Sequence, residues 1–264
     1  MYPPLTLSVK YLEYLFGASH SKGHGIHSPF VFDFIQKVLN DRTEYPEYAQ
    51  VDKLRKKLLS DNSPVPIEDY GAGSRAGPGS KSVAQIAAIA SRAPKYGKLL
   101  FRIARYYKPH YVIELGTSLG VSSAFLGMAD KSSVIVTGEG NYAVASLAKN
   151  NFESLGLTNV RIITGNFDNT LPEMVSAIPH VDLAFIDANH RKKPTLTYFH
   201  ELLKKITDTS IIIFDDIHWN AGMEAAWNEI KQHPAVLLTV DLFYFGIIFF
   251  RPEFKVKQHF RIRF

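Results

Sequence analysis

Residues 111–122, YVIELGTSLGVS, decide the fold of this chain. A short apolar run ends in Glu114, a turn with two glycines follows, and a helical pattern begins at Val121. This order predicts a strand, a tight loop and a helix, in which glycine lets the backbone approach a ligand and the helix N-terminus offers N–H groups. A carboxylate at the strand tip repels a pyrophosphate and suits a ligand with an ammonium group. The stretch therefore predicts a site for a nucleoside that carries an ammonium group.

Strands and helices alternate from this stretch onward, as they do in parallel α/β sheets. The predicted strands are Tyr111–Glu114, Val134–Thr137, Val160–Ile163, Leu183–Ile186 and Ser210–Phe214. The predicted helices are Val121–Met128, Ala143–Leu155, Leu171–Ser176, Thr195–Lys205 and Met223–Gln232. Only a tight turn separates two last strands, Val236–Phe243 and Phe245–Arg251, and a connection that short requires antiparallel pairing. Five parallel strands closed by a hairpin are not typical of a dinucleotide dehydrogenase.

The N-terminal part is predicted to be helical, with a first helix over residues 8–16 in which Val9, Leu12, Leu15 and Phe16 recur at helical spacing. Three histidines follow in residues 19–30, and they suggest either a metal cluster or a loop over the substrate. Glycines and a proline break the register between them, so the favoured interpretation is a loop whose Ser28-Pro29 begins the next helix.

Residues 61–80 are rich in proline and glycine, and they predict the boundary between an N-terminal helical extension, residues 1–80, and a main domain, residues 81–264. The segment also carries Asp69-x-Gly71-x-Gly73, which imitates a nucleotide loop. Prolines precede this pattern and Pro78 follows it where a helix should open, so we interpret it as an ordered loop that covers the active site.

The composition is that of a cytoplasmic globular protein, with 46% hydrophobic and 21% charged residues and no cysteine. No apolar run approaches the ~20 residues that span a bilayer, and the N-terminus lacks a signal-peptide pattern. Without cysteine, a metal would need oxygen or nitrogen ligands. The net charge of +5 comes largely from residues 53–57 and 255–263 and admits an RNA partner, although a spread solubility charge is favoured.

Acidic and aromatic residues follow the second and third strands, where a nucleoside ligand would lie. Glu139 comes 25 residues after Glu114, at the position that receives ribose hydroxyls in doubly wound sheets, although a surface acid between two glycines is the plain alternative. Gly165, Asn166 and Phe167 follow the third strand and supply a glycine turn with side chains able to bond or stack on a base.

Three aspartates follow the fourth and fifth strands, at the edge where open α/β sheets bind ligands. Asp187, Asp215 and Asp216 form an oxygen-rich set suited to Mg²⁺, Mn²⁺ or Ca²⁺, unless Asp216 instead caps the following helix. His190 and His218 have intrinsic pKa values suited to general-base work near neutral pH, although a lone histidine is more often structural.

These motifs, taken in order, resemble the class I S-adenosylmethionine-dependent methyltransferases over residues 94–251, and most closely the catechol and caffeoyl-CoA type of metal-dependent O-methyltransferase. The resemblance implies a Rossmann-like, doubly wound α/β sheet of seven strands, mostly parallel with an antiparallel last strand. It implies that the cofactor S-adenosyl-L-methionine is bound by these residues: Glu114, Gly116, Thr117, Ser118, Gly120, Ser122, Glu139, Gly165, Asn166, Phe167 and Asp187.

In that branch a divalent cation is held by two aspartates and an asparagine, and a lysine acts as the base. This chain matches at Asp187 and Asp215, has Asp216 at the asparagine position, and has His190 at the lysine position. The resulting hypothesis is transfer of a methyl group to the hydroxyl of a small molecule, with the metal acidifying the hydroxyl and His190 and Asp187 in catalytic roles.

Two other functions stay open, namely RNA methylation and a catalytically degenerate partner protein that binds the cofactor. The methyl acceptor is not predicted. A homodimer is also open, through the apolar hairpin Phe243–Phe250.

Overall fold

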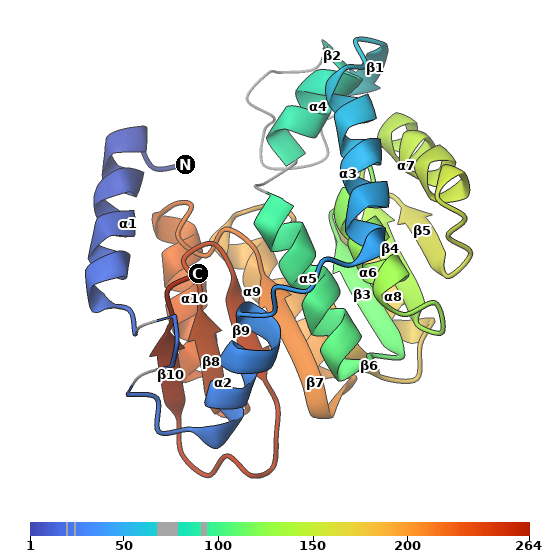
Figure 1. Ribbon diagram of the computed structural model, residues 1–264. Coiled ribbons are helices and arrows are strands. Elements are labelled where there is room, and N and C mark those ends of the chain that lie inside the picture. Colours follow the sequence, from blue (N-terminus) through green and yellow to red (C-terminus); the bar gives the residue numbers. More distant parts are fainter. Residues whose placement is uncertain (20, 24, 68–78, 91–93) are drawn as a thin grey trace. The chain divides into compact units, whose positions relative to one another are not determined.

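The computed structural model describes residues 1–19, 21–23, 25–67, 79–90 and 94–264 (Figure 1). Two of the three N-terminal histidines, His20 and His24, lie outside these residues, as does the pattern Asp69-x-Gly71-x-Gly73. The described chain forms two compact units: residues 1–40 with 179–264, and residues 41–178. The first forty residues therefore belong to one unit with the last third of the chain, and the predicted boundary at residue 80 stays a prediction.

The second unit is built on three parallel strands, β3 (Tyr111–Leu115), β4 (Val134–Glu139) and β5 (Val160–Thr164), in that order. Its helices are α3 (Pro46–Leu59), α4 (Val83–Ala90), α5 (Pro94–Tyr107), α6 (Val121–Ala129), α7 (Tyr142–Ser154) and α8 (Phe167–Ser176). A small antiparallel pair, β1 (Pro64–Ile67) and β2 (Gly79–Ser82), precedes α4. The strands and helices predicted from the sequence in this unit are all present.

The first unit carries five strands in the order β10-β8-β9-β7-β6. They are β6 (Val181–Ile186), β7 (Ile206–Phe214), β8 (Leu238–Asp241), β9 (Gly246–Phe249) and β10 (Gln258–Arg261). Its helical segments are α1 (Pro4–Gly17), α2 (Pro29–Phe34), the π-helical turn η1 (Ile35–Leu39), α9 (Lys192–Leu203) and α10 (Ala221–Gln232). As predicted, Ser28 caps α2: its hydroxyl accepts a bond from the N–H of Val31.

The predicted hairpin is confirmed, since β9 pairs antiparallel with both β7 and β8. The α/β fold class is confirmed with it. β10 is an additional strand, parallel to β8, so the strands from β3 onward exceed the predicted seven by one. All four residues of β8 and all four of β9 are buried within the chain, and a homodimer through the hairpin stays a prediction.

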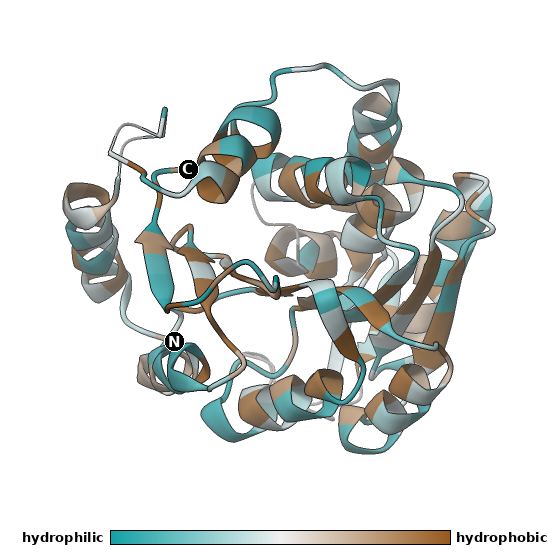
Figure 2. Ribbon diagram, turned by 90° about the horizontal axis from the view of Figure 1, so that it is seen from below, coloured by the Kyte–Doolittle hydropathy of each residue, from teal (hydrophilic) through white to brown (hydrophobic). Residues whose placement is uncertain are grey.

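Figure 2 shows the helices striped with hydrophilic and hydrophobic residues, as expected for helices covered on one face. Within the described residues, no helix has the length and apolar composition that a membrane crossing requires.

Gly120 gives a first test of the fold. Its φ is +82°, and a Cβ there would lie 2.5 Å from the ring of Phe152. We expect Gly120→Ala to lower the free energy of unfolding by about 2–5 kcal/mol, because left-handed backbone strain adds to overpacking. The control is Gly156→Ala, where φ is +66° and no atom lies within 4 Å. Urea unfolding that gives equal losses for the two variants would contradict the packing argument.

Candidate functional site

The loop between β3 and α6 is held in a left-handed, glycine-dependent conformation. φ is +104° at Gly116, +46° at Ser118 and +82° at Gly120. The backbone N–H groups of Gly116 and Thr117 both donate to the carbonyl of Gly138 at the end of β4, at 3.0 and 2.9 Å. The loop is therefore fixed to the neighbouring strand, and it leads directly into the N-terminus of α6.

Glu114 is fully buried beneath this loop. Its Oε2 accepts a hydrogen bond from Thr137 Oγ1 at 2.6 Å and another from Ser123 Oγ, and Thr137 in turn bonds Thr117. Burial raises the pKa of Glu114, and the hydroxyls of Ser122, Ser123 and Thr137 oppose that rise. These contacts join β3, β4 and α6, and a role of Glu114 in holding the cofactor stays a prediction.

Glu139 lies half-buried at the end of β4 and holds the other side of the loop. Its Oε2 accepts the N–H of Ser118 at 2.8 Å and its Oε1 accepts the N–H of Asn141 at 2.9 Å. Burial raises the pKa of Glu139, while these backbone bonds lower it. The N–H of Gly140 also bonds this carboxylate. An ionised carboxylate has about four acceptor sites, so it keeps capacity for about one more hydrogen bond, such as one from a hydroxyl.

Asn166 and Phe167 stand at the start of α8, after β5. Asn166 is exposed and its Oδ1 caps the helix by accepting the N–H of Asp168 at 3.0 Å, while Gly165 before it has φ +143°. The half-buried ring of Phe167 lies over Gly138, where a Cβ would come within 2.8 Å of it. The second unit thus gathers the predicted cofactor residues, except Asp187, at the carboxyl ends of its parallel strands.

Asp187 and His190 lie in the first unit, in the loop after β6. His190 Nε2 is 3.5 Å from Asp187 Oδ1, and both side chains are partly exposed. The loop is tied to the one after β7, because Asn220 Nδ2 donates to the carbonyl of His190 at 3.0 Å and the N–H of Asp215 donates to Ile186. The predicted catalytic pair is therefore brought together on a braced loop.

Asp215 and Asp216 follow β7 and are both buried. Asp215 Oδ1 accepts the N–H of Asp216 at 2.8 Å, and Asp216 has φ +56°. Across the described ranges, no group of three or more histidine, aspartate or glutamate side chains is arranged to hold a metal ion. The alternative that Asp216 caps the next helix is wrong, because Asn220 caps α10 by accepting the N–H of Met223.

His218 is clamped between two carboxylates. Its Nδ1 lies 3.0 Å from Glu224 Oε1 and its Nε2 lies 3.1 Å from Asp241 Oδ2. Burial lowers the pKa of His218, but the two carboxylates raise it by more. With both ring nitrogens engaged, His218 has the structural role that was the alternative to a catalytic one.

Sequence reasoning missed several positioning residues. Thr137 and Ser123 hold Glu114, and Asn220 joins the two loops of the first unit. Thr137 ends the apolar run of β4, and a polar residue at that position could have indicated its role. Asn220 stands just before a helical pattern, which could have indicated that it caps the helix.

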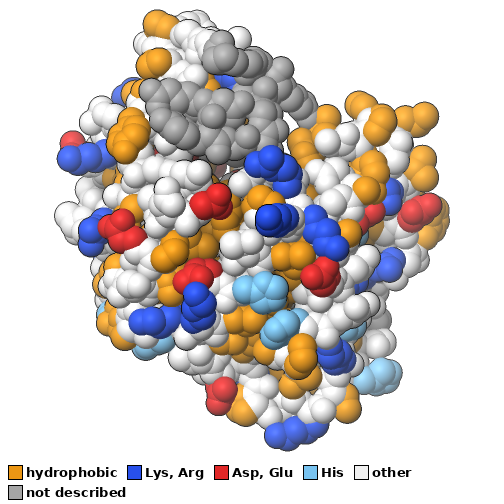
Figure 3. Space-filling view, turned by 180° about the vertical axis from the view of Figure 1, so that it is seen from behind, with side chains coloured by type: hydrophobic (Ala, Val, Ile, Leu, Met, Phe, Trp, Pro, Cys, Tyr) orange, Lys and Arg blue, Asp and Glu red, His pale blue; other side chains and the backbone are white. Residues whose placement is uncertain are grey.

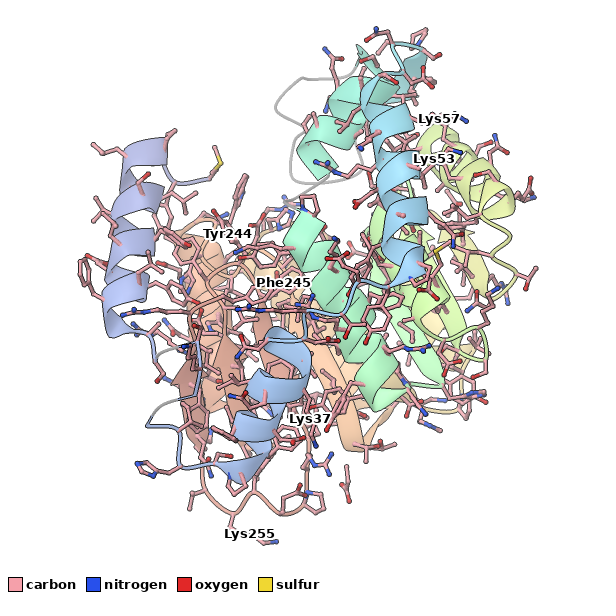
Figure 4. All side chains as sticks on the ribbon, viewed as in Figure 1. Lys37, Lys53, Lys57, Tyr244, Phe245 and Lys255 are labelled. Carbon is pink, nitrogen blue, oxygen red and sulfur yellow. The ribbon has the colours of Figure 1, made fainter. Side chains whose placement is uncertain are left out.

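The basic segments of residues 53–57 and 255–263 lie on different elements, and an RNA partner stays a prediction. Lys53 and Lys57 extend from α3, and Lys255 lies in the loop between β9 and β10 (Figure 4). The face shown in Figure 3 carries basic, acidic and apolar side chains together. This mixture fits the interpretation of the net charge as a spread solubility charge.

The glycine loop, the acid after β4 and the terminal hairpin together define the class I methyltransferase type of fold, and comparison with known proteins agrees with it. The family described as a methyltransferase domain matches residues 113–217. A catechol O-methyltransferase of Niastella koreensis is 32% identical over 130 residues, which are 48% of this chain and 58% of that protein. The resemblance drawn from the sequence is confirmed. The match spans less than two thirds of that relative's length.

Solved methyltransferases share the fold. An S-adenosylhomocysteine-bound methyltransferase from Podospora anserina superposes with a TM-score of 0.58 at 17% identity, covering 85% of this chain and 97% of that one. An O-methyltransferase from Bacillus cereus, bound to S-adenosylhomocysteine, gives 0.54 at 20% identity, with 83% and 95% covered. One from Streptomyces achromogenes, involved in tomaymycin synthesis and bound to S-adenosylmethionine, gives 0.56 at 18% identity, with 79% and 91% covered.

Glu224 gives a prediction about pH. Burial alone would raise its pKa, but hydrogen bonds from Tyr2, Lys10 and His218 lower it below the ordinary 4.5. A lowered pKa stabilises the fold above pH 4.5, and this contribution is lost as pH falls through the folded-state pKa. We expect Glu224→Gln to cost about 1–3 kcal/mol of unfolding free energy at pH 7, and much less in acid.

The control for this prediction is Glu229→Gln on the same helix. Glu229 is half-exposed and pairs with Lys192, so its loss should change stability by less than about 0.5 kcal/mol. Denaturant unfolding of both variants at pH 7 and near pH 3.5 tests the sign. A deficit in Glu224→Gln that grows on acidification would show that the charge does not stabilise the fold.

Proposed function

We propose that this protein is an S-adenosylmethionine-dependent O-methyltransferase that acts on the hydroxyl group of a small molecule. The observation that carries the proposal is the loop from Gly116 to Gly120, bonded through Ser118 to the carboxylate of Glu139. The local sequence identity to a catechol O-methyltransferase supports oxygen as the acceptor atom. Phenols and catechols are therefore the first acceptors to assay.

The residues present fit the cofactor. Gly120 and Gly138 leave no room for a Cβ, because Phe152 and Phe167 already lie against them, so the loop keeps its close backbone approach. Glu139 keeps acceptor capacity for a ribose hydroxyl, and the exposed Asn166 and half-buried Phe167 offer an amide and a ring for a base. When bound, the cofactor supplies a sulfonium methyl group to which a nucleophilic oxygen can bond.

His190 would take the proton of the acceptor hydroxyl. Its Nε2 faces Asp187, and a carboxylate beside an imidazole stabilises the imidazolium that forms when the ring accepts a proton. The left-handed backbone at Asn189 and His190 is held by the bond from Asn220, which keeps the ring oriented.

Divalent-metal assistance would rest on Asp187, Asp215 and Asp216. The described side chains do not form a three-ligand group, and an oxygen of Asp215 is occupied by a backbone N–H. The proposed transfer assigns proton removal to His190 and does not depend on a metal. Whether activity requires a metal is a separate test.

Glu139→Ala tests the cofactor site. We expect its dissociation constant for S-adenosylhomocysteine to rise about 10- to 100-fold, since bonds to a charged acceptor contribute about 1.5–3 kcal/mol. Titration calorimetry gives the constant directly. Glu153→Ala, which removes an exposed acid of α7 in the same unit, is the matched control and should leave it unchanged. Equal affinity in the wild type and Glu139→Ala would remove Glu139 from the site.

His190→Gln tests the base. We expect kcat for a catechol or phenol acceptor to fall about 10²- to 10⁴-fold while S-adenosylhomocysteine affinity stays within twofold. The control is His180→Gln, which alters a partly exposed histidine of the same unit. Loss of the lower pH limb of kcat in His190→Gln would identify the titrating group, whereas an unchanged profile would exclude His190 as the base.

The same assay decides the remaining alternatives. Activity that a chelator abolishes and Mg²⁺ or Mn²⁺ restores would add the metal to the mechanism, and full activity in excess chelator would remove it. Cofactor binding without transfer to any phenol, catechol or RNA would instead favour a cofactor-binding partner protein. RNA binding with a steep salt dependence would favour RNA as the acceptor.

A further inference from the structure

Helix α1 carries a row of large apolar side chains on its outer side. Leu5, Val9, Leu12 and Phe16 are 78%, 47%, 52% and 85% exposed. Val9, Leu12 and Phe16 belong to the same periodic pattern that predicts this helix from the sequence. A row of this kind would ordinarily face a core, so its exposure marks an interaction surface.

The opposite side of α1 is already anchored to its own unit. Tyr14 is buried and its hydroxyl donates to the carbonyl of Ile262, while the ring of Tyr11 meets Phe243 edge-on at 4.9 Å. Lys10 pairs with Glu224 at 3.0 Å. These contacts fix the rotation of α1 about its own axis. The four outer side chains therefore stay exposed, because α1 cannot rotate to bury them against its own unit.

The spacing of the row is that of a coiled-coil seam. Leu5, Val9, Leu12 and Phe16 are separated by four, three and four residues, which is the a/d repeat of a heptad. We propose that α1 pairs antiparallel with α1 of a second copy of this chain, through these four residues. This surface lies outside the methyl-transfer chemistry and does not depend on the proposed function.

The row is self-complementary in that orientation. In an antiparallel helix pair, the numbers of facing residues have a constant sum. A two-fold axis that places Leu5 against Phe16 of the partner subunit therefore also places Val9 against Leu12 of the partner subunit. A longer side chain then meets a shorter one at each level, which favours interdigitated packing. Each surface contacts its own counterpart, so the pairing closes as a dimer.

Charge favours a second copy over a membrane surface. The only charged residues in α1 are Lys10, which already pairs with Glu224, and Glu13. A helix that lies on a membrane needs a basic polar face, which α1 lacks. In the antiparallel pair, Glu13 comes near Ser8 of the partner subunit, so no like charges meet.

The size of the surface predicts a weak dimer. An apolar patch of this kind covers a few hundred Å², on the order of the largest patches on monomers. A stable interface needs about 800 Å² from each partner, so we expect association in the micromolar range. The helix is already folded against its unit, so pairing does not need to pay for helix formation.

Sedimentation velocity of the full chain from about 1 to 200 µM tests the proposal, with the weight-average mass expected to rise toward the dimer across that range. Phe16→Glu and Leu5→Lys should each keep the chain monomeric at the top concentration. Val256→Glu, at a 65% exposed apolar residue outside α1, is the matched control and should dimerise as the wild type does. Circular dichroism melts confirm that each variant folds.

Mixing Phe16→Glu with Leu5→Lys distinguishes the orientation. An antiparallel pair places the new acid against the new base, so the mixture should dimerise although neither variant does alone. A wild type that stays monomeric, or a mixture without recovery, would overturn the antiparallel pair. Co-sedimentation of a monomeric wild type with anionic phospholipid vesicles would assign the row to a membrane and would overturn the proposal too.

Discussion

The buried carboxylate of Glu114 is the constraint on which the loop between β3 and α6 depends. It lies at the end of β3 with no exposed surface, where an ionised or neutral carboxyl is tolerated only because Thr137 and Ser123 donate to it. Those two donors come from β4 and α6, so satisfying one buried group sets the positions of three elements. The backbone between them then turns through left-handed positions at Gly116, Ser118 and Gly120.

The loops of the first unit are fixed by the same kind of buried polar bonding without glycine. Asn189, His190 and Asp216 all have positive φ, a conformation that costs non-glycine residues of order 1–3 kcal/mol and persists only where surrounding contacts hold it. Asn220 supplies one such contact through its bond to the carbonyl of His190. Strain of this kind concentrates at functional sites, which agrees with the role proposed for His190.

The sequence predicted what depends on near neighbours along the chain. The glycine loop, the cap at Ser28 and the hairpin of β8 and β9 are signalled by residues a few positions apart, and all three are present. The clamp on His218 joins residues 6 and 23 positions away, and the bond from Tyr2 to Glu224 spans 222. Such pairings depend on tertiary packing, which local periodicity does not report.

Helix α1 shows the same limit in its orientation. Periodicity located the helix correctly, yet both of its sides carry large apolar or aromatic residues, so hydrophobicity alone does not decide which side is buried. The tyrosine side is buried because its hydroxyls and rings find specific partners: Tyr14 bonds the carbonyl of Ile262 and Tyr11 meets Phe243. Leucine and phenylalanine cannot make such a bond. The hydroxyl of Tyr14 therefore decides which side of α1 is buried, and the row without polar groups remains exposed.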